Sequence, residues 1–217
     1  MSIPPIAPYT MADVTVRTTP QLDWTIDPDR AALLIHDMQN YFVDAYEPGA
    51  EPLATVIPNI AALRDAADRA GMPVVYTAQP PRQHPSRRGL LTERWGTGIG
   101  DDDEARIIDD LATRPNDVEI TKWRYSAFAR TDLRSLLAHD GRDQLIITGI
   151  YAHIGVMLTA ADAFMQDVQA FLVTDAVADF NAPFHGAAVD YVSTTCGVPL
   201  ATADALAALG VKAAADA

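Results

Sequence analysis

Two ionisable residues stand where short apolar segments of the chain end. Asp37 follows the apolar run 31–35, and Lys122 follows the run 118–121. If both runs are strands of one parallel sheet, the carboxylate and the ammonium group project from the same sheet edge. They could share a proton in catalysis or hold each other in a structural salt bridge. Their spacing alone does not decide between these two roles.

Apolar segments alternate with amphipathic segments through most of the chain. The predicted strands are 31–35, 73–77, 118–121, 144–149, 170–175 and 198–202. The predicted helices are 56–70, 104–112, 132–139, 155–166 and 184–195. The first helix places apolar residues on one face, and Gly71 follows it as a stop signal. This alternation predicts an α/β fold with a parallel sheet covered on both faces.

The chain of 217 residues suits a single domain. Residues 1–29 are rich in Pro and Thr and predict an irregular N-terminal arm. Residues 30–209 form the predicted α/β domain, and 210–217 the predicted C-terminal tail.

The net charge of −13 argues against nucleic acid or an anionic membrane surface as a partner, because both bind basic faces. A small anionic substrate stays possible, since a few cations can dominate a pocket. No signal peptide is evident, and no apolar run approaches the roughly 18 residues of a membrane span. The single cysteine, Cys196, allows no internal disulfide. We therefore expect a cytoplasmic protein.

Four segments in this order resemble the isochorismatase family, and most closely its branch of siderophore isochorismatases and phenazine-pathway 2-amino-2-deoxyisochorismate hydrolases. The segments are His36-Asp37-Met38-Gln39, residues 76–80 (YTAQP), residues 121–128 (TKWRYSAF) and residues 149–155 (GIYAHIG). The resemblance runs from about Ile6 to Leu206. It implies a Rossmann-like fold with a six-stranded parallel sheet, helices on both faces and a homodimer.

The wider family includes amidases with an Asp-Lys-Cys triad. Asp37 and Lys122 match its first two members, but the third falls on Gly155, which offers no nucleophile. Cys196 lies elsewhere and is interpreted as a small apolar residue. The metal ligands of the amidases lack counterparts here, and neither His84 nor His185 shows a metal-ligand spacing. The sequence predicts no metal and no other cofactor.

The resemblance implies hydrolysis of the vinyl ether of 2-amino-2-deoxyisochorismate to trans-2,3-dihydro-3-hydroxyanthranilate and pyruvate. Asp37 is the candidate general acid, and Lys122 orients it or binds a substrate oxygen. Burial and a dianionic substrate would raise the pKa of Asp37, whereas Lys122 would lower it.

Two alternatives stay open. An isochorismatase would give 2,3-dihydro-2,3-dihydroxybenzoate and pyruvate. Val156 and the lack of room for a carrier domain favour the amino substrate, whereas 146–148 and 162–165 look siderophore-like. The fold could also be a non-catalytic docking partner in a biosynthetic assembly, although the retained polar residues argue against that.

The expected partner is a small dianionic cyclohexadiene, whose carboxylates need hydrogen-bond donors. Arg88 matches the carboxylate-binding arginine of the family. Gln79 can donate an amide hydrogen, and Tyr151 offers a hydroxyl. The backbone N–H of Gly155 is expected to start a helix, a good site for an anion, and the missing side chain there leaves room for the substrate ring. The matching apolar wall positions are Phe42, Trp95 and Tyr125. Without the resemblance, Arg88 would be a surface charge and Phe42 and Trp95 ordinary core.

Three further expectations concern local geometry. The Ile150–Tyr151 peptide is expected to be cis, as in this family. His36 is expected to point away from Asp37, on the alternate face of its strand. His153 is expected to be a structural hydrogen-bonding residue, and Asp101 to lie at a helix N-terminus.

Overall fold

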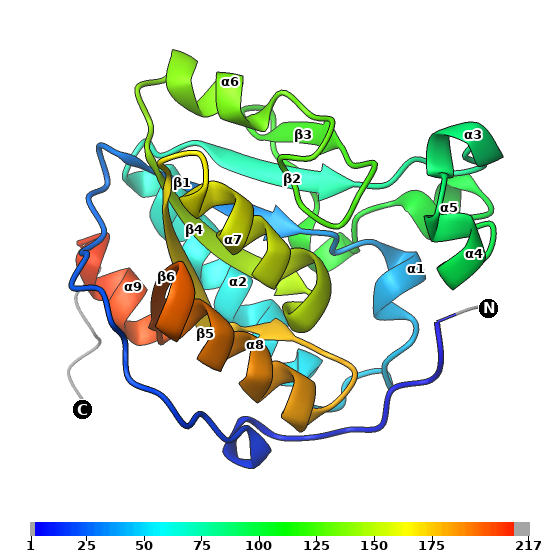
Figure 1. Ribbon diagram of the computed structural model, residues 1–217, viewed down its shortest axis with the longest axis horizontal. Helices are drawn as coiled ribbons and strands as arrows, with labels where there is room; N and C mark the ends of the chain where they lie inside the picture. The colour runs from blue at the N-terminus through cyan, green and yellow to red at the C-terminus, as the bar shows by residue number, and fades with distance from the viewer. Residues whose placement is uncertain (1–2, 211–217) are drawn as a thin grey trace.

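The sheet has six strands, and all of its pairings are parallel, as predicted (Figure 1). The computed structural model describes residues 3–210. The strands are β1 (Ala31–His36), β2 (Val74–Ala78), β3 (Val118–Thr121), β4 (Gln144–Ile150), β5 (Gln169–Ala178) and β6 (Gly197–Leu200). Their spatial order is β3-β2-β1-β4-β5-β6. From β1 the strand order runs to one side through β2 and β3 and to the other side through β4, β5 and β6. Ligands of such sheets bind at this switch point, between β1 and β4.

Helices cover both faces of the sheet (Figure 1). The longer ones are α2 (Leu53–Arg69), α6 (Leu133–His139), α7 (Met157–Phe164), α8 (Ala182–Thr195) and α9 (Thr202–Ala208). α2 and α9 pack on one core cluster, and α6, α7 and α8 pack on the other. Alternate residues of β1 enter the two clusters, Leu33 one and Leu34 the other, because successive strand side chains point to opposite faces.

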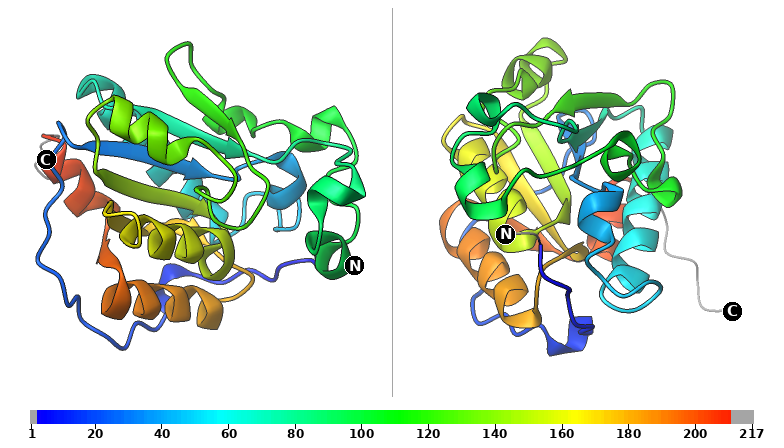
Figure 2. Two further views of the ribbon diagram at one scale, coloured as in Figure 1. Left: turned by 45° about the horizontal axis from the view of Figure 1, so that its top comes forward. Right: turned by 90° about the vertical axis from the view of Figure 1, so that its right-hand side faces the viewer.

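Short helical turns gather beyond the carboxyl ends of the strands, and Figure 2 (right) faces this end of the molecule. They are α1 (Asn40–Val43), α3 (Pro85–Arg88), α4 (Leu91–Trp95), α5 (Asp102–Ala105), the 3-10 turn η2 (Asp109–Leu111) and the π-helical turn η3 (Ala152–Val156). The sequence patterns predicted none of α1, α3, α4 or α9 as separate helices. The first three are too short to show a period.

The predicted helix 104–112 is wrong. α5 ends at Ala105, and the backbone at Arg106 is extended. Gln39 and Ile107 form an antiparallel bridge, and the N–H of Ile108 donates to Met38 O at 3.0 Å. These backbone bonds to the segment after β1 replace the helical ones. The carboxylate of Asp101 does accept from the first N–H groups of α5, as expected.

The N-terminal segment runs along the outside of the domain and contains one 3-10 turn, η1 (Met11–Asp13) (Figure 1). It is fastened to α8, because the N–H of Arg17 donates to Asp190 Oδ1 at 2.8 Å. Its beginning reaches the carboxyl end of the sheet, where Ile6 bridges Tyr46. Of the predicted tail, residues 211–217 lie outside the described part. None of the helices within residues 3–210 combines the length and the apolar character that a membrane crossing requires.

Candidate active site

A pocket opens at the carboxyl ends of β1 and β4, at the switch point of the sheet. Its lining includes every residue that the resemblance assigned to the site: Asp37, Lys122, Gln79, Arg88, Tyr151, Gly155, Phe42, Trp95 and Tyr125. The rest of the lining is Ile3, His36, Tyr41, Leu91, Ile150, Ile154 and Phe180. Nine positions from separate parts of the chain thus meet in one place.

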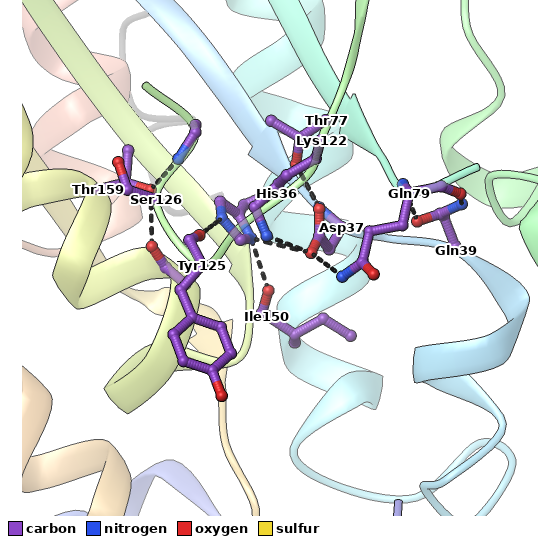
Figure 3. A network of polar contacts seen from close by, with 12 residues as sticks. His36, Asp37, Gln39, Thr77, Gln79, Lys122, Tyr125, Ser126, Ile150 and Thr159 are labelled. Carbon is purple, nitrogen blue, oxygen red and sulfur yellow. Dashed lines mark hydrogen bonds and ion pairs between the residues drawn. The ribbon is translucent and has the colours of Figure 1, made fainter. Parts of the chain in front are cut away.

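Asp37 and Lys122 form a buried ion pair in this pocket (Figure 3). Lys122 Nζ donates to Asp37 Oδ2 at 2.6 Å, and the two side chains are 2% and 6% exposed. The hydroxyl of Thr77 donates to Asp37 Oδ1 at 2.6 Å. Gln79 Nε2 lies 3.5 Å from Oδ2. Both carboxylate oxygens are therefore held by donors, which fixes the direction of the carboxylate.

The electrostatics of the pair are balanced between opposing effects. Burial raises the pKa of Asp37, but Lys122, His36 and Thr77 together bring it below its ordinary value. Burial lowers the pKa of Lys122 despite the neighbouring carboxylate. The site thus holds an ionised acid next to an ammonium group that releases its proton more easily than usual.

The expected direction of His36 is wrong. Its imidazole lines the pocket, and Nδ1 lies 3.9 Å from Asp37 Oδ2. The strict alternation of a strand does not extend to Asp37, because β1 ends at His36 and Asp37 has a φ of +50°.

The prediction that Gly155 leaves room for the substrate ring is also wrong, because the ring of His36 fills that space.

Arg88 is buried and faces the pocket, so the alternative of a surface charge is wrong. Its Nε donates to Gly96 O at 2.7 Å, while the buried Nη1 has no hydrogen-bond partner within residues 3–210. Burial lowers the pKa of Arg88, but a guanidinium stays charged at neutral pH. An unpaired buried donor of this kind suits a ligand carboxylate. The neighbouring Arg87 is exposed and lies over the ring of Trp123.

Aromatic rings form the wall of the pocket. The indole N–H of Trp95 donates to the hydroxyl of Tyr125 at 2.8 Å. Tyr151 lies against Phe180, with ring centroids 4.5 Å apart. Its hydroxyl donates to Phe42 O at 2.9 Å, so the expectation that Tyr151 offers its hydrogen to the substrate is wrong. Phe180 carries no motif, and its position shows only once β5 has been placed in the sheet.

Three other local expectations are confirmed, and they concern one peptide bond, His153 and Cys196. The Ile150–Tyr151 peptide is cis. His153 hydrogen bonds through Nδ1 to Asp179 Oδ1 at 2.6 Å. Cys196 is buried in an apolar cluster. Across the described chain, no three His, Cys, Asp or Glu side chains are grouped so that they could hold a metal ion.

Removing one member of the buried pair should cost more than removing both charges. Lys122→Met leaves the Asp37 carboxylate buried without its cation, and we expect a loss of about 3–5 kcal/mol in the free energy of unfolding. The double variant Asp37→Asn, Lys122→Met should lose clearly less. Urea unfolding of the four proteins at pH 7 measures this cycle. A loss in the double variant equal to the sum of the two single losses would contradict a tightly coupled pair.

His36 should make stability depend on pH. Burial and then Lys122 lower the pKa of His36 to about 4, although Asp37 opposes them. In the unfolded chain the ring takes up a proton near pH 6.5. The unfolded state therefore binds more protons between about pH 6.5 and 4, and the free energy of unfolding falls as the pH drops through this range. Between pH 7 and 4.5, the wild type should lose about 2–3 kcal/mol more than His36→Asn. Urea unfolding at the two pH values measures this difference, and equal losses would show that the ring is not held neutral.

Comparison with known proteins identifies the family. The isochorismatase domain matches residues 31–204. The isochorismatase of Bacillus subtilis (strain 168) is 50% identical over 203 residues, 93% of this chain, and this chain spans 65% of that protein. The phenazine biosynthesis protein PhzD of Pseudomonas fluorescens is 44% identical over 92% of this chain and 96% of its own length. The solved structure of an isochorismatase family protein from Burkholderia thailandensis has a TM-score of 0.77 at 26% identity, and the match covers 89% of this chain and 100% of that one. The chain therefore belongs to the isochorismatase family of hydrolases.

Proposed function

We propose that the protein hydrolyses the vinyl ether of isochorismate to 2,3-dihydro-2,3-dihydroxybenzoate and pyruvate. The observation that carries this proposal is a buried, oriented acid, Asp37, in a pocket with aromatic walls that has no side chain at Gly155 to act as a nucleophile. The relative named isochorismatase has the higher identity, 50% against 44% for the phenazine protein. This difference supports isochorismate over the amino substrate that the sequence favoured.

The reaction needs one proton delivered to carbon and no covalent intermediate. Asp37 gives its proton to the methylene carbon of the enolpyruvyl group, and the ether carbon becomes an oxocarbenium ion. Water adds to that carbon and releases a proton, which the Asp37 carboxylate takes back. The hemiketal then collapses to pyruvate and the ring alcohol. Thr77 and Lys122 hold the carboxylate during these steps.

Asp37 must carry a proton when the substrate is bound. Its pKa lies below the ordinary value in the free site. A dianionic substrate in the same pocket adds negative charge beside the carboxylate and raises its pKa, because like charges oppose ionisation. Binding of the substrate therefore couples to uptake of a proton by Asp37. Lys122 keeps its place through a hydrogen bond to Asp37 or to a substrate oxygen.

Arg88 binds a substrate carboxylate in this proposal. Its side chain lines the pocket, and its buried Nη1 has no hydrogen-bond partner within residues 3–210. A carboxylate there would satisfy the donor and anchor the substrate away from the ether bond. Arg88 then contributes to binding more than to the chemical step.

The amino analogue is a second candidate. The phenazine relative matches over nearly its whole length, and Val156 follows Gly155 as in enzymes of the phenazine type. Both substrates carry the same enolpyruvyl ether and differ at one ring substituent. Comparison of kcat/KM for the two, with lactate dehydrogenase reporting the pyruvate, decides between them. Release of pyruvate from neither substrate would contradict the proposal and favour a docking role.

Asp37→Asn removes the proton donor and keeps the shape of the side chain. We expect kcat to fall at least about 100-fold, because general acids contribute factors of about 10²–10⁴. KM should fall rather than rise, because the neutral amide no longer repels the dianionic substrate and needs no proton when it binds. The coupled pyruvate assay measures both constants, and a thermal melt controls for folding. Near-normal turnover would show that another group is the acid.

Arg88→Met and Arg87→Met form a matched pair of variants. We expect Arg88→Met to raise KM about 10- to 100-fold with kcat nearly unchanged, the effect of losing a charged hydrogen bond to substrate. Arg87→Met should leave both constants as they are, because Arg87 is exposed and lies over Trp123. Steady-state kinetics of both variants test whether Arg88 binds a substrate carboxylate. Equal effects of the two substitutions would show that it does not.

A further inference from the structure

The imidazole of His36 occupies the space that a side chain at position 155 would need. A Cβ built on Gly155 would lie 2.1 Å from Cε1 of His36, 2.7 Å from Nε2 and 3.1 Å from Nδ1. These separations are far below van der Waals contact. His36 is fully buried and lines the same pocket as Gly155 and Asp37. The ring and a side chain at position 155 therefore exclude each other.

The ring is confined between two backbone carbonyls, and as a neutral imidazole it donates its one hydrogen bond to the nearer of them (Figure 3). Nδ1 lies 2.7 Å from Ile150 O, so this nitrogen carries the hydrogen and donates it. Nε2 lies 3.3 Å from Tyr125 O. Both carbonyls belong to segments that line the pocket, one at the end of β4 and one after β3.

The backbone of His36 is confined as well. Gly149 pairs with His36 across the β1–β4 ladder and has a φ of +100°. A Cβ on Gly149 would lie 2.2 Å from the carbonyl oxygen of His36. One glycine thus touches the backbone of His36 and another touches its ring. This packing sets where the imidazole sits relative to Asp37.

We infer that His36 and Gly155 form an interlocked pair that determines which chemistry the Asp37–Lys122 site can perform. His36 is a positioning residue for ether hydrolysis: it holds the Ile150 carbonyl next to the pocket and keeps position 155 free of any side chain. A nucleophile at position 155 would face the same buried acid and amine, but it fits only if the imidazole is removed. The part of this inference that concerns turnover rests on the proposed function.

The imidazole both donates a hydrogen bond to Ile150 O and fills the space beside Gly155. Asparagine at position 36 keeps the hydrogen bond and removes the filling. Its amide can occupy the place of Nδ1 and donate to Ile150 O, while the volume of Cε1 and Nε2 is left empty. Leucine fills volume but offers no donor. His36→Asn should therefore keep kcat within about tenfold of the wild type, whereas His36→Leu should lose at least about 100-fold in kcat with KM changed less than threefold.

The packing test uses melting temperatures and needs no substrate. We expect Gly155→Ala to lower the melting temperature by about 2–12 °C, the range for an overpacked core in a chain of this size. In the double variant His36→Asn, Gly155→Ala, the melting temperature should match that of His36→Asn alone. Gly100→Ala is the control, because a Cβ there meets only the carboxyl end of Glu104, at 3.2 Å. A Gly155→Ala protein that melts with the wild type, or additive losses in the double variant, would overturn the inference.

A thiol at position 155 tests the exclusion of a nucleophile directly. In a Cys196→Ser background, His36→Asn, Gly155→Cys should fold and react with iodoacetamide at neutral pH. Gly155→Cys alone should melt earlier, like Gly155→Ala. A stable Gly155→Cys protein with an equally reactive thiol would overturn the inference. If the melting results hold but even the wild type releases no pyruvate, the proposed function fails and the interlocked pair stands.

Discussion

The buried ion pair of Asp37 and Lys122 is the interaction on which the rest of the site depends. Two charges with almost no exposure are costly to hold in a fold unless they pair at close range and find further hydrogen bonds. The 2.6 Å contact between them and the hydroxyl of Thr77 meet that requirement. The pair also sets the chemical problem, because the cation that stabilises the carboxylate opposes the protonation that a general acid needs.

The sheet topology explains why the pair forms where it does. Asp37 follows β1, Thr77 lies in β2 and Lys122 follows β3, so three neighbouring strands deliver their ends to one point. β4 lies on the other side of β1. At its end, the carbonyl of Ile150 accepts a hydrogen bond from His36. The short helices beyond the sheet add Arg88 and Trp95 as a cover. The sheet thus fixes the positions of Asp37, Thr77 and Lys122 relative to one another. The segments around the sheet supply Arg88 and Trp95, which can contact a ligand.

The sequence predicted much of this arrangement, and its failures have physical causes. The four central strands were found because buried parallel strands are continuous apolar runs. The edge strands β3 and β6 are only partly buried and gave weaker signals. The convergence of Asp37 and Lys122 followed from the rule about strand ends. The direction of His36 was wrong because Asp37 leaves the strand with a positive φ. The helix at 104–112 was wrong because the backbone of Ile108 bonds to Met38 instead of to its own segment. Such backbone pairings between distant segments leave no local pattern. The role of Phe180 in the wall could not be predicted for the same reason.

In the proposed mechanism, substrate binding drives a proton onto Asp37. Titration calorimetry with a saturated analogue, in which the enolpyruvyl group is replaced by a lactyl ether, measures this without turnover. Binding at pH 7 in buffers of different ionisation enthalpy gives the number of protons taken up. We predict an uptake approaching one proton for the wild type and almost none for Asp37→Asn. Binding of the analogue without proton uptake, or the same uptake in both proteins, would contradict protonation of Asp37 on binding.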